Sequence, residues 1–162
     1  VDLKTISILQ IFDNLPNVVE LELCETREKL YARYNHLPKY KDSTGGIVEY
    51  DLISMTETHR WITNCYSMEI TIDGNNMYFL SDNGVNVIDL YEVSIPQLLI
   101  TNPDSDDVWY SLKLSPDESQ LWIGNAKNYQ SEGEVLIYEN IAEPYLVKNF
   151  RVGLNPNTIT FF

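Results

Sequence analysis

The sequence contains no hydrophobic run that approaches the roughly 18 residues needed to cross a membrane, and it is short of basic side chains. Only 11 Lys and Arg residues stand against 24 Asp and Glu residues, which gives a formal net charge of −13 over 162 residues. A surface this negative repels nucleic-acid phosphates and anionic lipid headgroups. The composition therefore argues against nucleic-acid partners and against membrane insertion.

Cysteine and histidine are also scarce, with two of each. Cys24 and Cys65 fall at opposite ends of neighbouring expected strands, beyond the reach of a disulfide. Neither His36 nor His59 is accompanied by a nucleophile and a carboxylate on neighbouring loops, so we identify no catalytic set and no cofactor-binding residue. The sequence therefore favours a protein that is not an enzyme, without deciding the question.

Internal repeats dominate what is present. Three segments, 21–31, 70–78 and 112–122, each read as an alternating strand, a polar turn and an apolar strand, and a fourth copy begins at 158–161. Aligning Leu21, Ile70, Leu112 and Ile159 gives steps of 49, 42 and 47 residues, with a turn two residues shorter in the middle copy. Further short apolar runs follow in phase, so each repeat holds four short strands with period-two alternation.

Four strands per roughly 40–50 residues, repeated in tandem, are typical of β-propeller blades. We therefore predict an all-β fold, a β-propeller of four-stranded antiparallel blades, present as about three and a half blades of a larger ring. The expected units are outer strands of a preceding blade at 1–14, blades at 15–64, 65–102 and 103–153, and the inner strand of a following blade at 154–162. Because rings close with about 4–8 blades, we expect the remaining blades of the same, longer polypeptide, or other protein chains, as partners.

Two phrases carry a resemblance to known propeller repeats. Residues 78–90, YFLSDNGVNVIDL, resemble the LVIVD type of repeat, and the turn at 115–117, SPD, is similar to one common in YVTN-type and WD-like repeats. The Gly-His and Trp-Asp signatures of true WD repeats are absent. LVIVD-like repeats often occur in surface or extracellular proteins, whereas two free thiols fit a reducing compartment. Both an extracellular and a cytoplasmic location are therefore compatible with the sequence.

Two acidic groups are candidate cation sites, because Ca²⁺ binds several oxygen ligands. The polar face of the innermost strands carries Glu20, Glu22 and Glu69 beside Thr71, Ser111 and Lys113, and we expect it to look into the central channel. The loop at 102–107 carries Asp104, Asp106 and Asp107, without the Gly and distal Glu of an EF-hand. The alternatives are a solvated channel wall for the first group, and a solvated turn or a docking point for a basic partner for the second.

Two long hairpin connections, 34–46 and 125–134, replace what the middle repeat achieves with Asp82-Asn83-Gly84. Since the short version suffices for folding, the long versions are candidate recognition loops. Their candidate partner-binding residues are Lys39, Tyr40, Lys41 and Tyr129. The function favoured is a non-enzymatic scaffold for protein–protein interaction within a larger structural or surface assembly. The alternative is a propeller enzyme, a metal-assisted hydrolase or a quinoprotein-like protein, with its site in the central channel.

Overall fold

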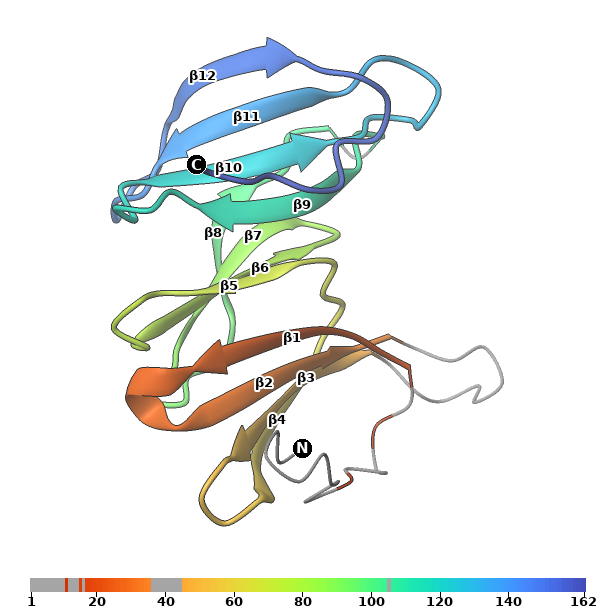
Figure 1. Ribbon diagram of the computed structural model, residues 1–162. Coiled ribbons are helices and arrows are strands. Elements are labelled where there is room, and N and C mark those ends of the chain that lie inside the picture. Colours follow the sequence, from red (N-terminus) through yellow and green to blue (C-terminus); the bar gives the residue numbers. More distant parts are fainter. Residues whose placement is uncertain (1–10, 12–14, 16, 36–44, 105) are drawn as a thin grey trace.

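The computed structural model describes residues 11, 15, 17–35, 45–104 and 106–162, which form three four-stranded antiparallel sheets stacked in chain order (Figure 1). The first blade comprises β1 (Val18–Cys24), β2 (Lys29–Tyr34), β3 (Gly46–Asp51) and β4 (Thr56–Ile62). The second comprises β5 (Met68–Ile70), β6 (Asn76–Ser81), β7 (Gly84–Asp89) and β8 (Gln97–Thr101). The third comprises β9 (Trp109–Leu114), β10 (Gln120–Asn125), β11 (Glu134–Glu139) and β12 (Leu146–Arg151). A 3-10 turn, η1 (Glu25–Arg27), joins β1 to β2.

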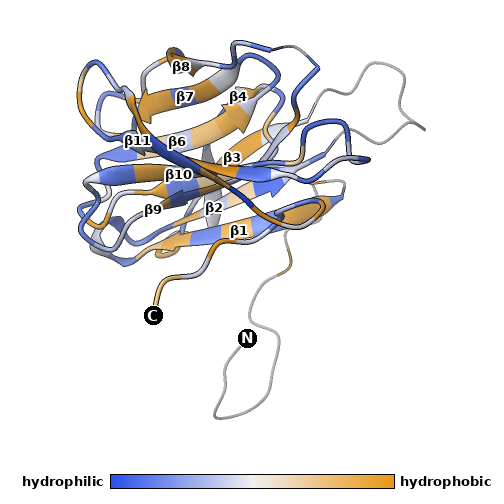
Figure 2. Cartoon of the chain, turned by 90° about the horizontal axis from the view of Figure 1, so that it is seen from above, coloured by the Kyte–Doolittle hydropathy of each residue, from blue (hydrophilic) through white to orange (hydrophobic). Residues whose placement is uncertain are grey.

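Every sheet is a simple meander in which each strand pairs with the next strand along the chain. The prediction of an all-β fold built from four-stranded antiparallel blades is thereby confirmed. The part of the chain that the structure describes holds no helix with the length and hydropathy of a membrane span. Hydrophobic residues are concentrated in the strands, while most connections are hydrophilic (Figure 2).

The turns at the ends of the innermost strands correct the repeat alignment. Thr71 Oγ1 donates to Asp73 and Ser115 Oγ donates to Asp117, each at 2.6 Å. Both turns are closed by the same backbone hydrogen bonds, from Thr71 N to Asn76 O and from Ser115 N to Gln120 O. The two turns are therefore equal in length, and Thr71 corresponds to Ser115 with a step of 44 residues, so the expected shorter turn in the middle repeat is wrong.

With this register, each sheet has two distinct faces. We call the face on the side of the earlier part of the chain the preceding face, and the face on the side of the later part the following face. The first interface is built from the buried side chains of one cluster, namely Cys24, Tyr31, Ile47, Trp61, Cys65, Met68, Met77, Phe79, Ile88 and Leu90. The second is built from another, namely Tyr78, Leu80, Val85, Ile100, Trp109, Leu112, Leu114, Leu121, Ile123 and Leu136. The innermost strands β1, β5 and β9 thus present their faces to neighbouring blades, since side chains alternate between the two faces of a strand.

The segment after β12 differs from its expected form. Residues 154–162 contain no strand, because they form no ladder with another strand in the described part of the chain. They lie instead against the following face of the third blade. Ser111 Oγ donates to Pro156 O at 2.8 Å, and the rings of Trp122 and Phe161 pack edge-to-face with centroids 5.1 Å apart.

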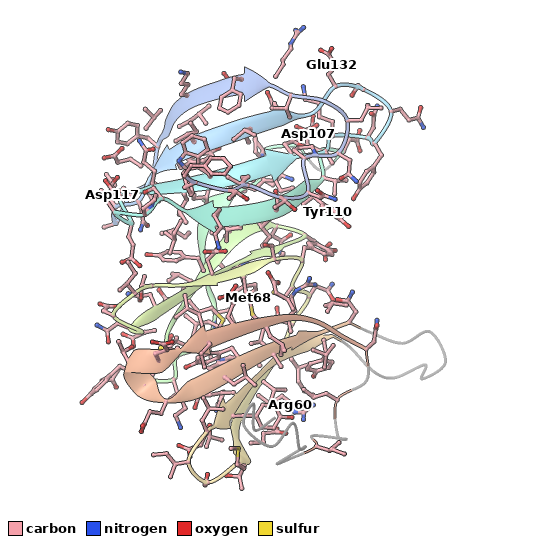
Figure 3. The ribbon with its side chains drawn as sticks, viewed as in Figure 1. Arg60, Met68, Asp107, Tyr110, Asp117 and Glu132 are labelled. Carbon is pink, nitrogen blue, oxygen red and sulfur yellow. The ribbon has the colours of Figure 1, made fainter. Side chains whose placement is uncertain are left out.

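The connections gather at two rims. The turns that follow β1, β5 and β9 lie at one rim, where Figure 3 places Asp117. The connections β4–β5, β6–β7, β8–β9 and β10–β11 lie at the other, which we call the long-connection rim and where Figure 3 places Asp107, Tyr110 and Glu132. The β6–β7 connection there is a tight hairpin in which Gly84 has φ 129°, and a Cβ atom at Gly84 would run into the Ile100 carbonyl oxygen.

Candidate functional site: an axial cavity

The innermost strands place polar residues at two equivalent positions on their following faces. Glu22, Glu69 and Lys113 occupy one position, because they pair with Tyr31, Tyr78 and Trp122 on the second strand of each blade. Two residues earlier on each strand stand Glu20, Ser67 and Ser111. Since strand residues two apart point to the same face, the three blades contribute two short layers of polar side chains.

These six residues line one cavity of about 620 Å³. Residues 157–161 line another part of it, together with Leu112, Leu114 and Pro116. The structure thus brings Glu20, Glu22, Glu69, Ser111 and Lys113 together in one place. Thr71 is different, since it does not line this cavity and donates to Asp73 in the adjoining turn.

Most of the charges in the cavity are paired. Lys113 Nζ donates to Glu69 Oε1 at 2.6 Å, and Arg33 Nε donates to Glu20 Oε2 at 2.7 Å. Arg33 also donates to the Cys65 carbonyl at 3.0 Å, which fixes its guanidinium between the first and second blades. The site therefore combines three carboxylates with two cations, each cation committed to one carboxylate.

Glu69 is the most perturbed group of the cavity. The residue is only 8% exposed, and burial raises the pKa of its carboxyl to about 7, although Lys113 and a backbone hydrogen bond from Leu114 act in the opposite direction. Burial also raises the pKa of Glu22, with Lys113 opposing and Glu20 reinforcing the effect. Burial disfavours the charged form of Lys113, but Glu69 and the neighbouring carboxylates outweigh it and raise the pKa of the ammonium.

No three His, Cys, Asp or Glu side chains among the described residues are arranged to hold a metal ion. In the cavity, two of the three carboxylates are already in ion pairs. In the 102–107 loop, Asp104 Oδ1 accepts from Asp106 N at 3.0 Å and Asp107 Oδ2 accepts from Asn125 Nδ2 at 2.6 Å. These carboxylates thus stabilise the loop itself, and the cation sites at both places stay predictions.

Of the predicted partner-binding residues, the structure describes Tyr129, which stands in the connection between β10 and β11. Lys39, Tyr40 and Lys41 lie outside the described residues. Tyr129 is 47% exposed, and its ring packs edge-to-face against Tyr110 with centroids 6.0 Å apart.

The equivalence of Glu22, Glu69 and Lys113 escaped the sequence reasoning. Aligning Ile70 with Leu112 shifts the second repeat by two residues against the third, and that alignment does not place these three residues at one position. The turn signal alone could have corrected it, because Thr71 and Ser115 each stand two residues before an aspartate. Hydroxyl and carboxylate side chains that close such turns are a stronger register mark than apolar residues, which recur every second position.

Solved structures with the same arrangement of strands are β-propellers. The propeller domain of the trilobed protease from Pyrococcus furiosus, described as having an open velcro topology, superimposes with a TM-score of 0.60 and 17% sequence identity over 84% of this chain and 42% of that chain. A quinoprotein alcohol dehydrogenase-like protein from Bacteroides thetaiotaomicron gives a TM-score of 0.60 and 14% identity over 81% of this chain and 33% of that one. The chain thus spans less than half the length of either, and the likeness establishes the propeller architecture. The sequence matches no known protein-family model, and no curated protein resembles it closely enough to indicate a relative.

Proposed function

We propose that this chain is part of a non-enzymatic propeller scaffold whose first blade is covered by a further blade. One comparison of equivalent positions carries the proposal. Leu21 is 59% exposed, whereas its counterparts Met68 and Leu112 are 0% and 3% exposed because each faces a preceding blade. Leu23 is 54% exposed, whereas its counterpart Leu114 is 6% exposed.

Leaving the side chains of Leu21 and Leu23 in contact with water is unfavourable in free energy. Full burial of a leucine side chain contributes about 1.5–3 kcal/mol. Val19, on the same face of β1, is also 43% exposed. A face of this chemistry, built from the same repeat as two covered faces, fits another blade of the same polypeptide or of a second protein chain.

The chemistry of the axial cavity favours the scaffold over a channel enzyme. A metal-assisted hydrolase in the channel would need free carboxylates to hold its metal, and Glu20 and Glu69 are each engaged by a cation. The LVIVD-like segment forms the hairpin of β6 and β7, and we place the blades in this repeat class as part of the same proposal.

Photo-crosslinking at Leu21 tests the proposal. Benzoylphenylalanine is placed at Leu21, or at Ile95 as a control, in the protein produced in its native source. Ile95 is 80% exposed but lies in the connection between β7 and β8. We expect Leu21 to capture a β-strand segment of the same or another polypeptide and Ile95 to capture none. Equal labelling from both positions would contradict the proposal.

A further inference from the structure

A pocket of about 330 Å³ lies at the long-connection rim, apart from the axial cavity. It is lined by Tyr66 and Asp82 from the second blade and by Asp107 and Trp109 from the entry to the third. Two blades therefore form its walls, and the axial residues Glu20, Glu22 and Glu69 take no part in it.

One of three half-exposed tyrosines on this side of the molecule, Tyr66, lines the pocket. Tyr66, Tyr110 and Tyr129 are 41%, 40% and 47% exposed and come from three separate parts of the chain, the β4–β5 connection, β9 and the β10–β11 connection. Tyr110 and Tyr129 are in edge-to-face contact. Burial, a hydrogen bond to Asp82 and the nearby Tyr129 raise the pKa of Tyr66 to about 12. Tyr110 and Tyr129 thus form an aromatic pair, and the influence of Tyr129 on the pKa of Tyr66 indicates that this pair lies near the Tyr66 side of the pocket.

The charge beside the tyrosines is of one sign. Asp82 accepts hydrogen bonds from Tyr66 and, at 2.9 Å, from Asn64, and Asp107 accepts from Asn125. An ionised carboxylate has about four acceptor positions, so both keep acceptor capacity toward solvent. Lys127, in the neighbouring connection, is already paired with Glu134 at 3.7 Å.

We propose that this tyrosine–aspartate pocket binds an arginine-containing peptide segment of a partner protein. A guanidinium group stacks on tyrosine faces and forms paired hydrogen bonds with carboxylates. The chain as a whole carries a net charge of −13 and draws basic segments toward it by long-range attraction. Acidic or phosphorylated segments are repelled by the same field.

Fluorescence anisotropy with a labelled hexapeptide of alternating glycine and arginine tests this binding. The test variant, Tyr66→Ala with Asp82→Asn, removes one ring and one charge from the lining of the pocket. The matched control, Tyr91→Ala with Glu92→Gln, removes the same groups from the connection after β7, where Tyr91 is 77% exposed. Thermal unfolding of both variants verifies that they are folded.

We expect the test variant to weaken binding by about tenfold or more and the control by less than about twofold, since cation–π and charge-assisted contacts are local. The citrulline analogue of the peptide, which has no charge, should bind at least about tenfold more weakly to the unmodified protein. Equal weakening by both variants would mean attraction to the acidic body alone and would overturn the proposal. Absence of peptide binding at millimolar concentration, or binding of neutral maltohexaose at the tyrosines instead, would also overturn it. None of these outcomes depends on what covers Leu21.

Discussion

The two interfaces between blades are built on the same backbone register but differ in chemistry. The first contains four sulfur-bearing side chains, Cys24, Cys65, Met68 and Met77, packed around Tyr31 and Phe79. The second is formed mainly by Leu, Val and Ile with Trp109, and a buried carboxylate, Glu69, meets Lys113 at its inner edge.

The difference shows that the repeated blade determines which positions are in contact between neighbouring blades. It does not determine which residue types occupy those positions. Flexible methionines fill irregular gaps, so the first interface depends on shape. The second interface carries an ion pair and a carboxyl of raised pKa, so it depends on pH as well. Three variants test this contrast.

Phe79→Ala should produce the largest loss, because Phe79 is completely buried in the first interface. Truncating a buried phenylalanine costs about 3–5 kcal/mol. The free energy of unfolding from urea titration measures the effect. Leu98→Ala is the control, since Leu98 is 51% exposed on β8. A loss at Phe79 no larger than at Leu98 would show that the first interface is not tightly packed.

Glu69→Gln should remove a pH dependence that belongs to the second interface. Burial raises the pKa of Glu69 from 4.5 to about 7, so the folded protein holds a proton there that the unfolded chain has released. The free energy of unfolding should therefore fall as pH rises from about 4.5 to about 7, by on the order of 2 kcal/mol. Urea titrations at pH 5 and pH 8 measure this difference.

The variant should show a smaller fall between the two pH values than the unmodified protein. Asp51, whose pKa is lowered by turn hydrogen bonds from Ser54 and by Lys29, acts in the opposite direction. Its contribution is lost as pH falls through its range, below the window of Glu69. Identical pH dependence in both proteins would contradict the raised pKa of Glu69.

Tyr31→Phe should give the smallest effect and probes the polar contact of the first interface. The Tyr31 hydroxyl donates to Glu49 Oε2 at 2.8 Å, and Glu49 also accepts from Thr58 at 2.6 Å. Because Glu49 keeps the hydrogen bond from Thr58, loss of the bond from Tyr31 should cost about 1.5 kcal/mol, the low end for a bond to a charged acceptor, as measured by urea titration. Tyr145→Phe, at a tyrosine that is 57% exposed, should be neutral. A cost above that of Phe79→Ala would reverse the ranking of shape over hydrogen bonding in this interface.

Much of the architecture could be predicted, because period-two alternation and turn residues are local signals. The hairpin at 82–84 and the four strands of each blade follow from such signals. The strand expected at 158–161 did not form, because a strand needs a hydrogen-bonded neighbour that local sequence cannot supply.

The candidate sites were only partly predictable. The place of Tyr129 in a long connection marks it as a candidate, whereas no local signal marks Tyr66 or Tyr110. These two residues stand in an inter-blade connection and at the start of a strand, and nothing in the sequence says that either lies near Tyr129. The carboxylates of the cavity were identified individually, while the pairing of Glu69 with Lys113 depends on residues 44 positions apart.

The amino-acid sequence by itself determined that the chain folds into repeated four-stranded antiparallel blades, since alternation and turn chemistry act over a few residues. The tertiary structure alone decided which faces are covered and which charges meet. The polar side chains of β1, β5 and β9 gather in one cavity, where Lys113 pairs with Glu69. The physical reason is that the register between blades is set by packing between residues far apart in the sequence. A shift of one strand by two residues leaves its alternation of apolar and polar residues unchanged, but replaces every contact that the strand makes with the neighbouring blade.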